Sequence, residues 1–234
     1  MKKYIGVVAL LLVLASSPAF AATRVWGLYG WGDNWFGTSS GVDDIAAKAR
    51  EIPGVAFVNV RNYWETQRVA DEILASPPHD KIVIYGYSCG LNAATVIAKG
   101  VNPHHVATVT GIQQSLWCGG DPLYSNVGYA QDTYGSCIET WGLGCKRLKA
   151  GDGFVGSVVN IRRPDLEHAE ADNDPDAQAD VLNAIAQTAE GDGRHHFFGH
   201  GHLLVRRGVI KIKTGVAMVR RGVQEIVRYH GEQP

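Results

Sequence analysis

The sequence predicts an α/β protein built on a mostly parallel β-sheet with helices on both faces. Apolar runs of strand length alternate with segments of helical periodicity through the first half of the chain. Such alternation favours parallel strands, because each parallel connection needs a crossover that is usually a helix. Hydrophobic residues make up 45% of the 234 residues and charged residues 19%, which is typical of a chain with one sizeable buried core.

The expected elements follow one another with short turns up to residue 112. The expected strands cover residues 24–29, 55–60, 81–85 and 106–112, and the expected helices between them cover 42–49, 66–74 and 91–99. A Gly-, Cys- and aromatic-rich stretch, 115–153, then contains a possible strand at 127–131. A strand at 154–161 and a helix at 176–189 complete the predicted domain, residues 22–193.

Residues 1–21 have the features of a secretory signal peptide. Lys2 and Lys3 precede a short apolar run, and small residues suited to signal peptidase follow at Pro18–Ala21. The apolar run is too short to span a bilayer comfortably. We therefore expect an exported protein, periplasmic or secreted, without a stable membrane span.

The tail, residues 194–234, is basic and contains His195, His196, His200 and His202. The residue pattern of this tail predicts no particular secondary structure. The histidines could bind a transition metal, but their spacing matches no metallohydrolase motif, and a solvated loop is the preferred interpretation. The formal net charge of −1 gives no reason to expect a nucleic-acid partner. We expect no metal and no cofactor, and the sequence leaves the oligomeric state open.

The pentad Gly86-Tyr87-Ser88-Cys89-Gly90 matches the G-x-S-x-G turn that presents a nucleophilic serine. A purely apolar strand precedes it and a small-residue helix follows, as this motif requires. The glycines allow strand and helix to meet closely, and the free N–H groups of the helix favour developing negative charge. Ser88 is the predicted nucleophile; the plain alternative is a serine that merely caps the helix.

A serine hydroxyl needs a base that removes its proton, and His168 is the favoured candidate. It follows the strand that ends at residue 161 and precedes the final helix. This position agrees with the chain order serine, acid, histidine that accompanies the G-x-S-x-G turn. The tail histidines are rivals only if the tail folds back over the sheet. Two N–H donors should stabilise an oxyanion: the backbone of Cys89 and that of Trp31 in the Gly30–Gly32 turn. Trp35, Phe36 and Trp64 could line an apolar acyl site.

Several blocks together resemble a family of exported bacterial α/β-hydrolases, often labelled lipase- or thioesterase-like. They are the glycine turn at Gly30, the segment 40–46, the serine pentad with Asn92-Ala93-Ala94, the segment 125–131, and 153–160 leading to His168. The resemblance covers about residues 25–189. It implies an α/β-hydrolase-like fold and hydrolysis of a small-molecule carboxylic ester or thioester through an acyl-enzyme.

The resemblance leaves the acid of the catalytic triad unsettled. Such proteins usually carry Asp-Pro after the strand at 106–112, where this chain has Gln113-Gln114. Gln can hydrogen-bond an imidazole but cannot stabilise an imidazolium by charge. Asp132, expected directly after the next strand, is therefore the preferred acid, Asp121 the second choice, and Asp165 is close to His168 in sequence. A site with a weak or missing acid could still be an active serine–histidine dyad. The alternative is a non-catalytic binding protein on the same fold, for which Gln113 is the main support.

The four cysteines are compatible with disulfides after export. Cys89 lies in the serine turn, and we expect it to stay free. One pair among Cys118, Cys137 and Cys145 could then close a loop, and the sequence does not say which.

Overall fold

The computed structural model describes residues 21–33, 41–101, 106–135 and 146–191. All of these residues belong to one compact unit. The first twenty residues, which make up nearly all of the expected signal peptide, and the expected tail at 194–234 lie outside the described residues. No helix in the described part of the chain has the length and apolarity needed to cross a membrane.

Six strands form one sheet in the order β2-β1-β3-β4-β5-β6, and every neighbouring pair is parallel. The strands are β1 (Thr23–Tyr29), β2 (Val55–Asn62), β3 (Lys81–Tyr87), β4 (Val106–Ile112), β5 (Val127–Tyr134) and β6 (Ser157–Arg162). This confirms the predicted α/β class with a parallel sheet. Because all strands run the same way, the turns that follow them lie at one edge, here called the carboxyl edge.

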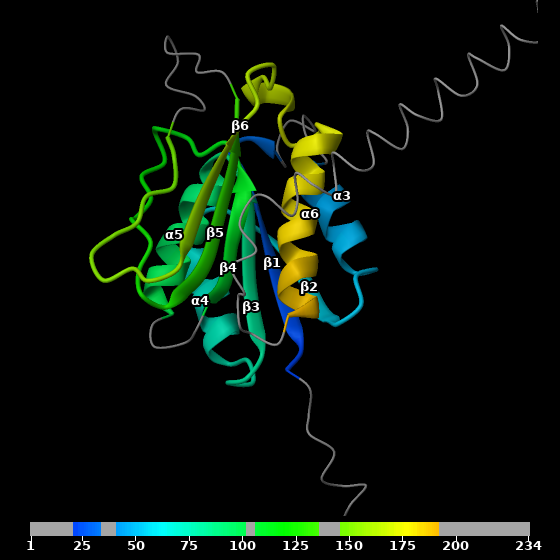
Figure 1. Cartoon of the computed structure of the whole chain (residues 1–234), viewed down its shortest axis with the longest axis vertical. Coiled ribbons are helices and arrows are strands. Elements are labelled where there is room, and N and C mark those ends of the chain that lie inside the picture. The colour runs from blue at the N-terminus through cyan, green and yellow to red at the C-terminus, as the bar shows by residue number, and fades with distance from the viewer. Residues whose placement is uncertain (1–20, 34–40, 102–105, 136–145, 192–234) are drawn as a thin grey trace, which may run out of the picture. The chain divides into compact units, whose positions relative to one another are not determined.

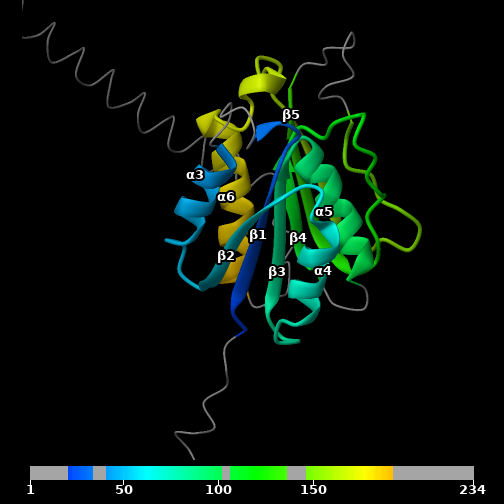
Figure 2. The ribbon, with the colours of Figure 1, turned by 180° about the vertical axis from the view of Figure 1, so that it is seen from behind.

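Helices cover both faces of the sheet, as the alternation of elements predicts (Figure 1, Figure 2). One face carries α3 (Gly41–Ala49) and α6 (Pro175–Glu190), and the other carries α4 (Thr66–Leu74) and α5 (Cys89–Gly100). Adjacent residues of a strand point to opposite faces, so Val83 packs toward α3 and α6 while Ile84 packs toward α4 and α5. Both are fully buried, which explains the unbroken apolar run of β3.

The elements begin and end close to their expected bounds, with two differences at the strands of the second half. The strand expected at 154–161 begins only at Ser157, and the strand expected at 127–131 continues to Tyr134. The second difference matters for the site, because it places Asp132 inside β5 and not after it.

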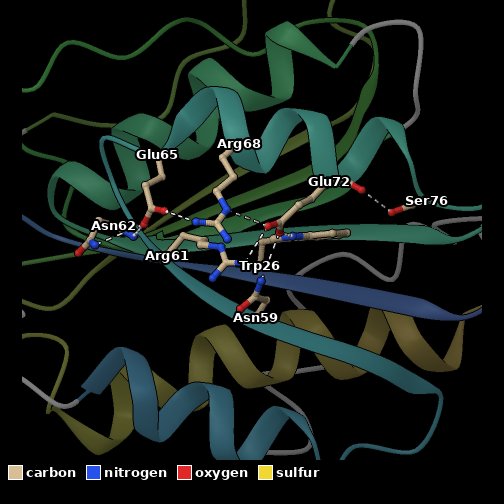
Figure 3. Close-up of polar contacts among 8 residues, drawn as sticks. All are labelled: Trp26, Asn59, Arg61, Asn62, Glu65, Arg68, Glu72 and Ser76. Atoms are coloured by element: carbon tan, nitrogen blue, oxygen red, sulfur yellow. Dashed lines mark hydrogen bonds and ion pairs between the residues drawn. The ribbon is translucent and has the colours of Figure 1, made fainter.

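Helix α4 is fixed to the sheet by hydrogen bonds that converge on the carboxylate of Glu72 (Figure 3). The indole N–H of Trp26 on β1 donates to it over 3.0 Å, and Asn59 and Arg61 on β2 donate over 3.2 and 2.7 Å. Burial alone would raise the pKa of Glu72, but the hydrogen bonds from Arg61, Trp26 and Asn59 and the charge of Arg61 together lower it. This carboxylate therefore joins one helix and two strands.

Candidate active site

Ser88 lies in a sharp turn between β3 and α5. Its backbone has φ 53° and ψ −120°, a left-handed conformation that is costly for a residue with a side chain. A side chain at Gly86 would overlap the backbone of Gly90, and one at Gly90 would overlap the Leu28 carbonyl. The two glycines are thus required for strand, turn and helix to pack this closely. The turn sets Ser88 at the carboxyl edge, with only 5% of the residue exposed.

His168 comes to the serine from a short 3₁₀ turn, His168–Glu170, that follows β6. Its Nε2 lies 3.0 Å from Ser88 Oγ, although 80 residues separate the two in sequence. The hydroxyl of Tyr87, the neighbour of Ser88, donates to the His168 carbonyl oxygen. The backbone of the histidine is therefore tied to the same strand end that presents the serine.

Gln113 holds the other ring nitrogen of this histidine. The Nδ1 atom of His168 lies 2.7 Å from Gln113 Oε1, while the amide nitrogen of Gln113 donates to the Leu166 carbonyl over 3.2 Å. The second contact fixes which end of the amide faces the ring, so the Gln113 oxygen accepts a hydrogen bond from the N–H at Nδ1. The ring then carries its hydrogen on Nδ1 and presents an unprotonated Nε2 to the serine hydroxyl.

The position of Gln113 is determined by its surroundings. The residue is fully buried, has φ 51°, and donates its backbone N–H to the Thr133 carbonyl over 3.0 Å. A left-handed conformation in a buried residue directly after β4 directs the side chain toward His168. The sequence indicated that a Gln here can hydrogen-bond an imidazole, but it favoured Asp132 as the partner of His168.

Asp132, the preferred acid, does not contact His168. It lies within β5, paired with Gly111 on β4 and Asn160 on β6, because the strand continues to Tyr134. The residue is fully buried, and neither carboxyl oxygen makes a hydrogen bond within the described part of the chain. Burial raises its pKa to about 8; the nearby backbone N–H of Gln113, which donates to the Thr133 carbonyl, offsets this only in part.

The other candidate acids are also placed away from the imidazole. Asp121 forms an ion pair with Lys99 over 3.2 Å at the surface, and its backbone N–H donates to Thr95. Asp165 is exposed. Among the described residues, the side chain that meets His168 Nδ1 is the neutral amide of Gln113.

Burial lowers the pKa of His168 to about 4, well below the ordinary value of 6.5. Gln113 is an amide where a triad has a carboxylate, and no charged group among the described residues opposes that shift. The imidazole is therefore neutral at pH 7, which is the form a general base requires.

The two expected oxyanion donors lie at neighbouring places on the carboxyl edge. Cys89 is the first residue of α5, where backbone N–H groups have no partner within the helix. Gly90 packs against the carbonyls of Leu28 and Tyr29, so the turn after β1 that contains Trp31 lies beside this helix start. That turn is closed by the Asp33 carboxylate, which accepts from the Gly30 N–H. The Trp31 side chain itself is 71% exposed.

The structure corrects the expectation for the cysteines: Cys89 is not free but forms a disulfide with Cys118. The pairing follows from the path of the chain after β4. Asn92 on α5 donates to the Ser115 carbonyl and accepts from the Ser115 N–H, both over 2.9 Å, which brings the following loop back to the helix start. Cys137 and Cys145 lie outside the described residues.

The described residues contain no group of three or more His, Cys, Asp or Glu side chains arranged to hold a metal ion. The tail histidines, for which a solvated loop is the preferred interpretation and metal binding the alternative, lie outside the described residues. So do Trp35 and Phe36, two of the aromatic residues suggested for an acyl site. The described site thus consists of a serine, a histidine and a glutamine.

No protein-family model matches the sequence, and no curated protein matches it significantly. Several solved structures are similar in fold. Human thioesterase 2 is 10% identical, with a TM-score of 0.47 over 76% of this chain and 100% of that one. A cutinase-like protein from Cryptococcus sp. is 14% identical, with a TM-score of 0.45 over 75% of this chain and 99% of its own.

A third similar structure is a lidless α/β serine hydrolase from Xanthomonas campestris. It is 16% identical, with a TM-score of 0.43 over 74% of this chain and 84% of that one. Likenesses at this level assign no activity to the chain. The function must be argued from the geometry of its own site.

Proposed function

We propose that this chain is an exported serine hydrolase that cleaves a carboxylic ester or thioester through an acyl-enzyme at Ser88. The supporting observation is the 3.0 Å contact of Ser88 Oγ with His168 Nε2, in a histidine whose tautomer is fixed by Gln113. A hydroxyl is a weak nucleophile unless a base removes its proton during attack, and this geometry supplies the base.

The proposed reaction has two steps. Ser88 Oγ attacks the acyl carbon and His168 Nε2 takes the hydroxyl proton; that proton then passes to the leaving alcohol or thiol as the bond to the acyl carbon breaks. In the second step His168 takes a proton from water, whose oxygen attacks the acyl carbon. The bond to Ser88 breaks and its oxygen recovers the proton. The N–H groups of Cys89 and Trp31 are the proposed donors to the oxyanion in both steps.

Gln113 takes the position of the triad acid in this proposal. It can hold the ring in the productive tautomer, but it cannot stabilise the imidazolium by charge. We therefore expect a smaller rate enhancement than that of a triad with a carboxylate, because the charged partner is one source of transition-state stabilisation.

Export is supported by the signal-like residues 1–21 and by the disulfide between Cys89 and Cys118, because disulfides persist in oxidising compartments. The export proposal implies a mature protein that begins at Ala22.

A fluorophosphonate probe tests the proposal directly, since it reacts with activated serines. We expect covalent labelling of the wild-type protein and none of Ser88→Ala. Ser125→Ala is the matched control, because Ser125 is exposed on the loop before β5, and it should label normally. The intact mass of the labelled exported protein should correspond to a start at Ala22. A folded wild-type protein that the probe does not modify would refute the serine-hydrolase proposal.

A second candidate is a non-catalytic binding protein on the same fold. The neutral Gln113 beside His168 is the observation that favours it. Turnover of p-nitrophenyl acetate by the wild-type protein, lost in Ser88→Ala, would exclude this second candidate.

A further inference from the structure

The loop that follows Gln113 is fastened to the start of α5, beside the candidate nucleophile. We call residues 115–120 the anchored loop. Its Cys118 is joined by a disulfide to Cys89, the residue after Ser88, with a Cα–Cα distance of 5.3 Å. The fully buried Asn92 makes two hydrogen bonds to Ser115 and donates to the Gly119 carbonyl as well.

Further contacts hold the far end of the anchored loop. Lys146 donates to the carbonyl oxygens of Gly119 and Gly120. The hydroxyl of Thr95, one turn after Asn92 on α5, accepts the N–H of Asp121. The loop is thus held at several points along a stretch of about six residues.

This firmly held loop nevertheless exposes large apolar side chains. Leu116 is 50% exposed and Trp117 is 71% exposed, and they lie directly before the disulfide-bonded Cys118. Ordering a loop costs conformational entropy, which is normally offset by burying apolar groups. Here ordering comes from the disulfide and the hydrogen bonds, and the apolar groups are left available for contact.

Among the described residues, Trp117 is one of three exposed tryptophans that lie at the carboxyl edge of the sheet. Trp31, Trp64 and Trp117 are exposed, and they follow β1, β2 and β4 respectively, so all three come from the carboxyl edge that holds Ser88. Exposed Val155, in contrast, precedes β6 and belongs to the opposite edge. Exposed tryptophan side chains are therefore found at the carboxyl edge, which also holds the candidate active site.

The two sides of Ser88 are occupied differently. Leu166 and Ala171, which flank His168, pack in the core on the side of α3 and α6. Leu91 and Ala93, between which Asn92 anchors the loop, pack in the core on the side of α4 and α5. His168 must reach the leaving-group oxygen or sulfur, so the leaving group occupies the His168 side. An acyl group on the opposite side of Ser88 from His168 would extend toward the anchored loop.

We propose that Leu116 and Trp117 on the anchored loop form the contact surface for an apolar acyl chain, and that this surface selects medium-chain acyl esters over acetyl esters. This inference rests on the proposed function of Ser88. It assigns acyl-chain specificity to residues that take no part in the proton transfers.

The test compares kcat/KM for p-nitrophenyl acetate and p-nitrophenyl octanoate. We expect the wild-type protein to favour octanoate. Trp117→Ala should lower kcat/KM for octanoate by about 10-fold, since removing the ring removes much of the apolar area that the chain would bury. The acetate value should stay within about 2-fold, because the acetyl group is too short to reach the loop.

Matched variants separate this effect from a general loss of activity. Val155→Ala removes a side chain that is 86% exposed at the opposite edge, and it should change neither ester. Trp117→Phe keeps an aromatic ring and should keep most of the preference for octanoate. Leu116→Ala gives a second test of the same surface and should lower the octanoate value as well.

The outcomes distinguish the inference from the function on which it rests. If the wild-type protein neither reacts with a fluorophosphonate nor cleaves acetate, the proposed function fails. If it does both, but Trp117→Ala and Leu116→Ala leave the octanoate-to-acetate ratio unchanged, only the inference fails. An equal loss for both esters in Trp117→Ala would also overturn the inference, because the ring would then support the site as a whole and not the acyl chain.

Discussion

At the scale of single residues, the unusual feature of the site is the neutral amide beside His168. The Gln113 side chain is fixed by the Leu166 carbonyl, so its oxygen faces Nδ1 and sets the tautomer. Gln113 therefore orients the imidazole but places no negative charge beside it. The carboxylate of a catalytic triad does both: it orients the ring and stabilises the imidazolium.

The absence of a negative charge at Gln113 predicts an unusual pH dependence of kcat/KM. With the pKa of His168 lowered to about 4 by burial, the acidic limb of kcat/KM for the wild-type protein should fall near pH 4 to 5. In Gln113→Glu a carboxylate beside Nδ1 favours the imidazolium and raises the pKa of His168, so the limb should move up by about one pH unit or more. The measurement is a pH profile of kcat/KM on p-nitrophenyl acetate.

Gln113→Leu is the companion variant. It removes the partner of Nδ1 without adding charge, so kcat/KM should drop by roughly 10²-fold, within the ~10²–10⁴ range of general-base catalysis. Its acidic limb should not move up. A Gln113→Glu profile that coincides with the wild-type profile would show that this side chain does not govern the imidazole.

At the scale of elements, the carboxylate of Glu72 joins helix α4 to two strands of the sheet. The donors to Glu72 come from both β1 and β2, and the buried ring of Trp26 is one of them. Apolar residues of the helix, Val69 and Ile73, supply the packing. The polar contacts fix where along the strands the helix sits (Figure 3).

We expect Glu72→Ala to destabilise the protein by about 1–3 kcal/mol, because it leaves three donors without their acceptor. Asp71→Ala, on the exposed side of the same helix, is the control and should cost less than about 0.5 kcal/mol. Urea unfolding gives the free energies, and hydrogen exchange should show faster exchange in α4 for Glu72→Ala alone. Equal stabilities of the two variants would contradict a fastening role for Glu72.

At the scale of the whole molecule, three carboxyl groups are buried without a cationic partner among the described residues. Burial raises the pKa of Asp33 to about 6, that of Asp172 to about 7 and that of Asp132 to about 8. Each group keeps its proton in the folded state at pH values where it loses it in the unfolded state. Their contribution to stability is therefore full below about pH 4 and decreases as the pH rises toward 8.

Asp132→Asn tests this dependence, because an amide has nearly the same shape and does not ionise. At pH 8 it should raise the free energy of unfolding by at least ~1 kcal/mol, or roughly 2–4 °C in Tm, whereas at pH 4 the effect should be small. Asp152→Asn, at an exposed loop position, should change Tm at neither pH. Melting curves at the two pH values provide the measurement, and a variant less stable than the wild type at pH 8 would refute a buried, protonated Asp132.

Local sequence was sufficient for the elements and for the serine turn. The apolar run before Ser88, the small residues after it and the two glycines depend on neighbours only a few positions away. The bounds of α4 (Thr66–Leu74) and β4 (Val106–Ile112) agree with the expected ranges for the same reason. His168 could be singled out because the order of strands restricts which turn can reach the serine.

The partners of His168 and Cys89 were decided by tertiary structure. Whether Asp132 or Gln113 faces the imidazole depends on where β5 ends and on the left-handed backbone at Gln113, and both follow from strand pairing over long sequence distances. The disulfide of Cys89 likewise depends on the loop that Asn92 draws back to α5. Sequence by itself determined the parallel sheet and the place of the serine, because both depend on local periodicity and on the steric requirements of neighbouring residues. The packing of distant segments decided which side chains complete the site.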